Sequence, residues 1–95
     1  MAMSFDINTV SIAGIVDSGV EERSDKTSVT FSLSSCYELH GMNKEVSVPI
    51  VAYGQTALAV KAKLNVGDSI HVSGTLRRDK DGNLIIAALD ILRKE

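Results

Sequence analysis

The chain has 95 residues, 44% of them hydrophobic and 23% charged, and its formal net charge is −2. This composition fits one globular domain over residues 1–95, with residues 1–7 as a loose lead-in. No apolar run approaches the roughly 20 residues of a membrane span, and the N-terminus lacks the basic and apolar blocks of a signal peptide. The single cysteine, Cys36, excludes an internal disulfide and indicates a cytoplasmic protein.

The charge is unevenly distributed along the chain. Residues 1–48 carry a net charge of −4 and residues 49–95 a net charge of +2. Nucleic-acid binding usually accompanies a basic balance, which the whole chain lacks, but a local positive field can act where the net charge does not. The alternative interpretation of the basic second half is an ordinary surface on which positive and negative charges are interspersed.

Two strands are predicted in the first half. The first, Val10–Asp17, has apolar residues on both faces, so it is covered on both sides or pairs with another subunit, and Gly14 marks a bend or a close backbone approach. The polar stretch Glu21–Lys26 is a loop or a frayed strand start. The second strand, Thr27–Ser35, alternates strictly, and the polar segment Tyr37–Glu45 is expected to be a hairpin loop.

The third predicted strand, Val46–Tyr53, directs Ile50 and Ala52 to the core and Tyr53 outward, and Gly54 ends it. A short helix follows, because apolar and amphipathic side chains recur at helical spacing. These residues are Ala57, Leu58, Val60, Lys61 and Leu64. The residues that end the helix are Asn65, Gly67 and Asp68.

Two more strands complete the prediction. The period of two resumes over Ile70–Leu76 and again over Leu84–Leu92, which is apolar on both faces. Asp81-Gly82 between them indicates a tight hairpin turn. An all-β chain of five strands, with one short helix between strands three and four, has the element order of an OB-fold barrel. A split-sheet α+β domain is the alternative.

Several motifs carry a family resemblance: Asn8-x-Val10-x-Ile12-x-Gly14, Phe31-x-Leu33, Val48-Pro49-Ile50-Val51-Ala52-Tyr53-Gly54 and Val66-Gly67-Asp68-x-Ile70-x-Val72-x-Gly74-x-Leu76-Arg77. From Asn8 to Leu92 they resemble the bacterial single-stranded-DNA-binding protein family. Primosomal replication protein N, a dimeric relative with the same fold, is equally compatible. The resemblance implies an OB-fold and sequence-tolerant single-stranded DNA binding in replication, recombination or repair. It also implies a homodimer or homotetramer, with replication proteins as candidate partners.

The chain departs from this family in its aromatic residues. The family stacks bases on several aromatic side chains, typically including tryptophans, and this chain has no tryptophan. Tyr53 matches the aromatic before the glycine that ends strand three, and Tyr37 is similar to another. Ser47 stands at a third such position, and the last hairpin offers Arg78 and Lys80 in place of an aromatic.

The candidate nucleic-acid-binding residues combine one or two stacking rings with loop cations and a hydroxyl donor. They are Tyr53, Tyr37, Arg77, Arg78, Lys80, Ser47, Lys44 and Arg23. Tyr37 shares the parity of the core residues Phe31 and Leu33, so it points inward unless a bulge reorients it. The alternative is that Tyr53 is a half-buried strand residue and that the hairpin is a solvated turn offset by its own aspartates.

Catalytic interpretations find little support. Cys36 and His40 are four residues apart, but two potential ligands do not make a zinc site, and Cys36 is expected to be a small buried residue. There is no glycine-rich phosphate loop and no nucleophile elbow. We expect no enzyme activity, metal or cofactor. The alternative function is an OB-fold protein-interaction or replisome accessory module with little or no DNA binding, which the missing tryptophans and the acidic first half favour.

Overall fold

The computed structural model describes residues 6–24 and 27–94, which form six strands and one helix. Most of the predicted lead-in therefore lies outside the described residues. The elements are β1 (Val10–Val16), β2 (Glu21–Glu22), β3 (Ser28–Leu39), β4 (Met42–Tyr53), α1 (Gly54–Lys63), β5 (Ser69–Arg78) and β6 (Leu84–Arg93). Within these residues no helix is long and apolar enough to cross a membrane.

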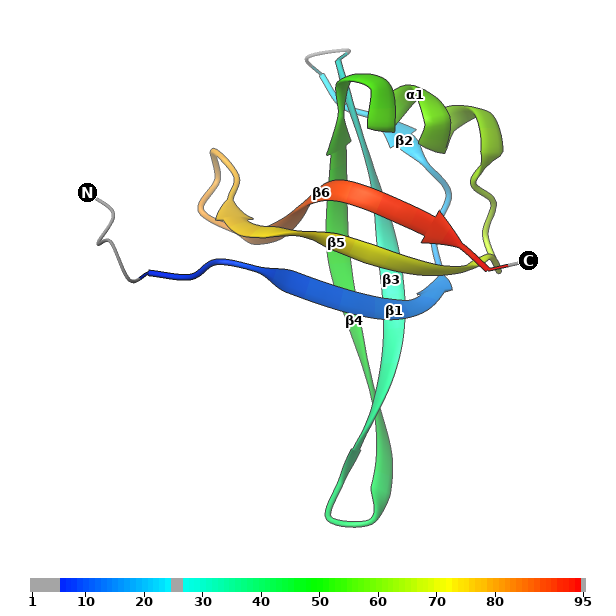
Figure 1. Cartoon of the computed structure of the whole chain (residues 1–95), viewed down its shortest axis with the longest axis vertical. Coiled ribbons are helices and arrows are strands. Elements are labelled where there is room, and N and C mark those ends of the chain that lie inside the picture. The colour runs from blue at the N-terminus through cyan, green and yellow to red at the C-terminus, as the bar shows by residue number, and fades with distance from the viewer. Residues whose placement is uncertain (1–5, 25–26, 95) are drawn as a thin grey trace.

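Five of the strands close into a barrel (Figure 1). Strand β1 pairs with β5 on one side and β3 on the other, β3 pairs with β4, and β6 lies between β4 and β5. All these pairings are antiparallel except β4–β6, which is parallel. The predicted five-stranded, all-β barrel with one helix is confirmed. The helix lies between β4 and β5 rather than between strands three and four, because the unpredicted two-residue strand β2 adds one to the count.

The predicted hairpin loop over Tyr37–Glu45 is wrong. Strands β3 and β4 continue through it, with unbroken pairing from Ser28↔Tyr53 to Leu39↔Met42. His40 and Gly41 form the turn, with φ values of 54° and 76°, as a tight hairpin requires. This β3–β4 ribbon, residues 35–46, extends away from the barrel (Figure 1). Its polar composition hid the strands, because neither of its faces enters the core.

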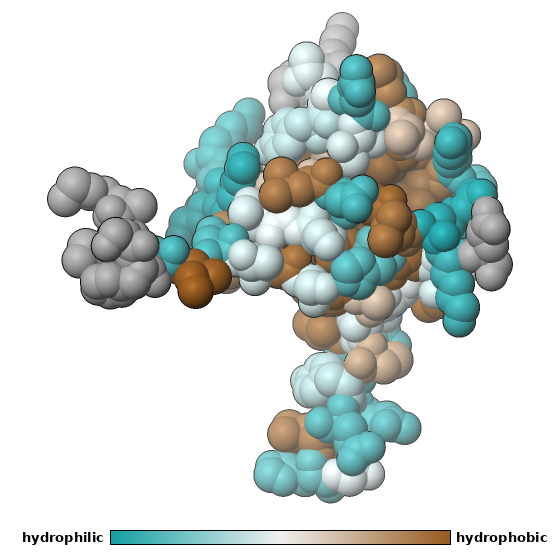
Figure 2. Space-filling view, viewed as in Figure 1, coloured by the Kyte–Doolittle hydropathy of each residue, from teal (hydrophilic) through white to brown (hydrophobic). Residues whose placement is uncertain are grey.

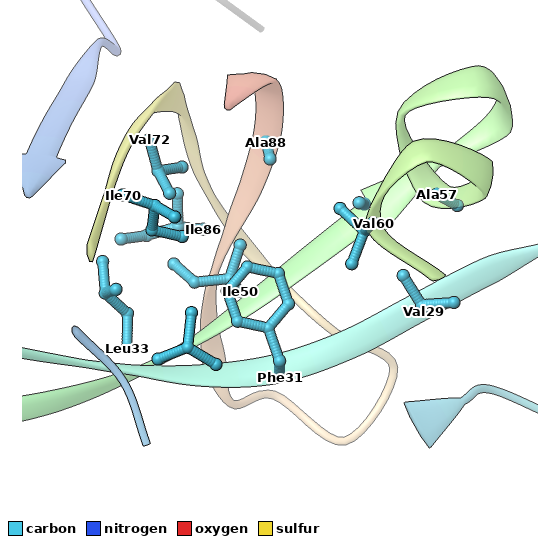
Figure 3. Packing of buried hydrophobic residues seen from close by; sticks show 12 residues of the cluster. Val29, Phe31, Leu33, Ile50, Ala57, Val60, Ile70, Val72, Ile86 and Ala88 are labelled. Carbon is cyan, nitrogen blue, oxygen red and sulfur yellow. The ribbon is translucent and has the colours of Figure 1, made fainter. Parts of the chain in front are cut away.

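The core fills the barrel with the inward residues that the alternation predicted (Figure 3). Phe31, Leu33 and Ile50 are at most 3% exposed. Helix α1 covers one end of the barrel through Ala57 and Val60, each 4% exposed. Leu58, predicted to share that face, is 66% exposed, because it lies outside the narrow helix face on which Ala57 and Val60 are buried.

Two glycines mark places where strands approach too closely for a side chain. A Cβ atom on Gly14 would lie 2.1 Å from the Ser34 carbonyl oxygen, and one on Gly74 would lie 2.1 Å from that of Ala87. Gly14 directly precedes Ile15, the residue at which β1 pairs with both β5 and β3. The predicted close backbone approach at Gly14 is confirmed, and it lets the barrel close.

Candidate nucleic-acid interface

A groove of about 520 Å³ crosses the outer face of β3 and β4. Its floor is formed by Thr30, Pro49, Val51 and Ile85. One wall is residues 21–24 and the other is part of the hairpin between β5 and β6. Val51 and Ile85 point away from the core but are only 2% and 6% exposed, because the walls overhang them. The groove thus offers an apolar floor between two polar walls.

Strand alternation places the floor. Pro49, Val51 and Tyr53 share the outer face of β4, opposite the inward residues Ile50 and Ala52. Val51 pairs with Thr30 of β3 on one side and with Ala87 of β6 on the other. The Thr30 hydroxyl donates to the Ile50 carbonyl oxygen at 3.0 Å, so the polar part of this side chain is already satisfied.

The first aspartate of the hairpin between β5 and β6 stabilises the turn that forms this wall of the groove. The Asp79 carboxylate accepts backbone N–H bonds from Asp81 and Asn83, both at 2.9 Å. The bond from Asn83 is the main cause that lowers the pKa of Asp79 below its ordinary value, and the positive charge of Arg23 also contributes. Arg78 donates to the Gly82 carbonyl oxygen at 2.9 Å and braces the same turn.

The opposite wall is the short strand β2 and the residues after it. Glu22 pairs with Val29 in the sheet, and its carboxylate forms an ion pair with the Lys61 ammonium of the helix at 2.7 Å. The Arg23 amide donates to the Ser28 carbonyl oxygen at 2.9 Å, and its guanidinium donates to the Tyr53 hydroxyl at 3.3 Å. Arg23 therefore joins this wall to the aromatic ring at the end of β4.

The structure brings three predicted residues together. Arg23 and Lys80 line the groove from opposite walls, and Tyr53, 40% exposed, is tied to it through Arg23. Arg77 and Arg78 do not line it: the Arg77 side chain donates to the Thr75 hydroxyl at 3.1 Å, and Arg78 is engaged within its own turn.

Ser47 lies further along the outer face, outside the groove lining. Its hydroxyl donates to the Asp17 carboxylate at 2.8 Å and lies 2.7 Å from the Ser32 hydroxyl. These contacts form a polar patch in which the hydroxyl already has protein partners.

Tyr37 and Lys44 lie elsewhere. They are direct cross-strand partners on the β3–β4 ribbon, so their side chains share one face of it. That face continues the inward face of Phe31 and Leu33, because the ladder has no bulge between them. It is the opposite face of the sheet from the groove. Tyr37 is nevertheless 50% exposed, since the ribbon has left the barrel.

Sequence reasoning set the hairpin aspartates against its cations, but it did not predict a groove with carboxylates on both walls and an apolar floor. Among the described residues, four carboxylates line it, from Glu21, Glu22, Asp79 and Asp81, against the two cations Arg23 and Lys80. The sequence signal for the floor was the apolar outer face of the last strand, where Ile85 and Ala87 are both buried. Such a lining favours a flat apolar group on the floor and few phosphate contacts.

The ribbon also carries the cysteine. Cys36 is exposed, which corrects the expectation of a small buried residue, because its position lies beyond the barrel. His40 stands in the turn at the ribbon's end. Among residues 6–24 and 27–94 there is no group of three or more His, Cys, Asp or Glu side chains that could hold a metal ion.

A closed five-stranded barrel of this strand order, with a groove across two strands and between two loops, defines an OB-fold of the kind whose members bind oligonucleotides and oligosaccharides on that face. No family model and no curated protein matches the sequence.

Solved structures match it over nearly the whole chain. A small single-stranded DNA-binding protein from Streptomyces coelicolor has a TM-score of 0.76 and 21% identity, over 96% of each chain. The second single-stranded DNA-binding protein (SSBb) from Mycobacterium smegmatis has a TM-score of 0.75 and 19% identity, over 90% of this chain and 87% of that one. PriB from Ralstonia solanacearum has a TM-score of 0.73 and 17% identity, over 94% and 100%. The predicted resemblance is confirmed at the level of the fold.

Proposed function

We propose that this chain binds single-stranded DNA without strong sequence preference, in the groove across β3 and β4, and acts in replication, recombination or repair. The observation that carries the proposal is the position of the groove. It lies on the strand face and between the two loops with which OB-folds bind oligonucleotides. Two of the structural relatives are named as single-stranded DNA-binding proteins, which supports the same assignment.

The groove lining indicates how a strand of DNA would be held. Bases would lie over Pro49, the exposed residue of the apolar floor, and one base would stack on the Tyr53 ring. Stacking of a base on an aromatic side chain is worth about 1–3 kcal/mol and is sequence-tolerant, since every base has a π-face. Arg23 already orients the ring through its hydroxyl, so little ordering is needed on binding.

Phosphate contacts are few in this arrangement. Among the residues that the structure describes, Lys80 and Arg23 are the cations of the groove lining, and the four carboxylates there repel a phosphate backbone. With phosphate contacts from these two cations, log K should fall with log salt at a slope of about −1.4. The expected affinity is therefore weak and depends more on base stacking than on charge.

The test is a fluorescence-anisotropy titration of labelled oligo-dT at two salt concentrations. Tyr53→Ala should weaken binding by about 5- to 150-fold, which corresponds to one stacked base. Tyr37→Ala is the matched control: the same ring is removed from the ribbon, on the other face of the sheet, and the affinity should stay unchanged. Absence of binding by the unmodified chain at low salt would reject the proposal.

We also propose that the chain self-associates as a dimer or tetramer. The outer face of the sheet formed by β1, β5 and β6 carries the exposed residues Ile15 (45%) and Leu92 (60%). Pairing places Ala13, His71 and Leu92 in one row across this face. Light scattering should give a mass above that of one chain at micromolar concentration, and Leu92→Glu should lower it. A strict monomer would contradict this proposal.

A further inference from the structure

We infer that a second groove, between α1 and the C-terminal half of β6, binds an extended peptide of a partner protein, which adds a strand to β6. This groove has a volume of about 470 Å³ and shares no lining residue with the groove across β3 and β4. The inference is independent of DNA binding, because no residue lines both grooves and β6 enters them with different segments.

The edge of β6 is open along this groove. The parallel pairing of β6 with β4 ends at Ala88, whereas its pairing with β5 continues to Arg93. Residues 89–93 therefore have a strand neighbour on one side only. In place of a strand, the helix lies beside this edge (Figure 1).

The phase of the β5–β6 ladder decides which backbone groups face the groove. The Lys94 amide donates to the Ser69 carbonyl oxygen at 2.8 Å, so this pair is hydrogen-bonded. In an antiparallel ladder such pairs alternate, and the residues between them direct N–H and C=O away from the partner strand. Ile91 and Arg93 are those residues, and both line the groove. Within residues 6–24 and 27–94, no backbone partner is seen for them on that side.

Unpaired backbone groups of a strand edge are the recognition element of β-strand addition, in which the main chain supplies affinity and alternate side chains supply specificity. A nucleic acid cannot continue such a ladder, because it has no peptide groups. The occupant that fits this edge is therefore an extended polypeptide.

The rest of the groove suits the side chains of such a strand. Thr56, Ala59 and Lys63 line it from one face of α1, and Leu64 and Ile91 are half-buried beside them. Figure 2, in the view of Figure 1, shows hydrophobic residues between the helix and this part of β6. Five extended residues span about 16 Å and a ten-residue helix about 15 Å, so the two walls match in length.

The charges at the two ends of the groove indicate which end of the bound peptide carries a charge. Asp90 lies at one end of the groove and Lys63 and Arg93 at the other. Arg93 is engaged, because it donates to the Lys63 carbonyl oxygen at 2.9 Å and lies 3.8 Å from the Asp68 carboxylate. In the described part of the chain the Lys63 ammonium has no ion pair. The occupant is thus a strand with alternating apolar side chains and a carboxylate at the end beside Lys63.

The test uses two labelled seven-residue peptides, Thr-Val-Thr-Val-Thr-Glu-Glu and its reversed sequence, in fluorescence-polarisation titrations against the full chain. One orientation should bind and shift the backbone amide NMR signals of Ile91 and Arg93. Two N-methylated forms of that peptide test whether main-chain hydrogen bonds to β6 hold it. One is methylated at both valines and the other at the first and third threonines. Only the form whose methyl groups point away from β6 should bind.

Variants locate the site. Ala59→Arg places a long side chain in the groove and should weaken peptide binding at least tenfold, whereas Ala62→Arg makes the same change at an exposed position outside the lining. Oligo-dT binding should be the same in both variants, which separates this site from the DNA groove. The inference fails if neither peptide binds at millimolar concentration, if both N-methylated forms bind equally, or if Ala59→Arg binds as the unmodified chain does. It also fails if Ala59→Arg alone changes the oligomer mass, because the occupant would then be a second copy.

Discussion

Strands β3 and β4 form one continuous ladder with one alternation of side chains, yet its two halves differ in how far those side chains are covered. In the barrel half, Leu33 and Ile50 are fully buried on the inner face, and the groove walls cover Val51 on the outer face. In the ribbon half, Tyr37 and Leu39 stand on the same inner face but are 50% and 47% exposed. The period of two indicates which face a side chain is on. Whether that face is covered depends on what the remaining chain places against it.

The same division separates the candidate site residues. Tyr53, Arg23 and Lys80 gather around the groove at the barrel half, whereas Tyr37 and Lys44 pair on the ribbon. The sequence analysis placed all five in one set of candidate nucleic-acid-binding residues. Strand pairing divides them between two faces of the sheet, so variants of matched residues in the two halves test the assignment.

The largest expected difference concerns stability. Leu33→Ala should lower the free energy of unfolding by about 2–5 kcal/mol, because it leaves a cavity in the core. Leu39→Ala, the same change on the same face of the same strand, should stay within about 0.5 kcal/mol. Urea unfolding followed by circular dichroism measures both. Equal losses would mean that the ribbon packs against something in solution.

The next effect lies at the boundary between the halves, where β1 meets β3. Gly14→Ala should destabilise by about 1–3 kcal/mol, because its Cβ atom would overlap the Ser34 carbonyl oxygen and the strands must separate. Gly19→Ala is the control, since nothing lies within 4 Å of its Cβ position. Thermal unfolding of the two variants compares them, and a Gly14→Ala variant as stable as the control would refute the close approach.

A smaller effect separates the two lysines. Lys80→Ala should make the salt dependence of oligo-dT binding shallower, by about 0.7 in the slope of log K against log salt, because one phosphate contact is lost. Lys44→Ala, on the ribbon, should leave the slope unchanged. A change at Lys44 and none at Lys80 would place the DNA on the ribbon instead of in the groove.

The smallest effect is the pH dependence of the hairpin wall. Because backbone hydrogen bonds lower the pKa of Asp79 in the folded chain, its contribution to stability is present above the ordinary value of 3.8 and is lost as pH falls through the lower folded value. The ribbon turn at His40 and Gly41 has no such carboxylate. NMR titration of the Asp79 carboxyl group should give a midpoint below 3.8. A midpoint at or above that value would show that the turn does not hold the carboxylate.

Several elements were predictable because their signals are local. The alternation around Phe31 and Ile50 identified the inner face, Gly54 ended a strand at φ 57°, and Gly14 marked a close approach. The ribbon was not predictable in the same way: its strands are polar on one face and uncovered on the other, so they resemble a loop. Strand β2 was missed because two residues are too short to show a period.

The sequence by itself determined the order of the five barrel strands and the helix, the inward faces of β3 and β4 and the tight turn at Asp81-Gly82. These depend on backbone geometry within a few residues. Only the tertiary structure decided that Arg23, Tyr53 and Lys80 share one groove, and that the edge of β6 stays open beside the helix. Those arrangements follow from pairing between strands far apart in the chain. The period of a single strand carries no information about its neighbours.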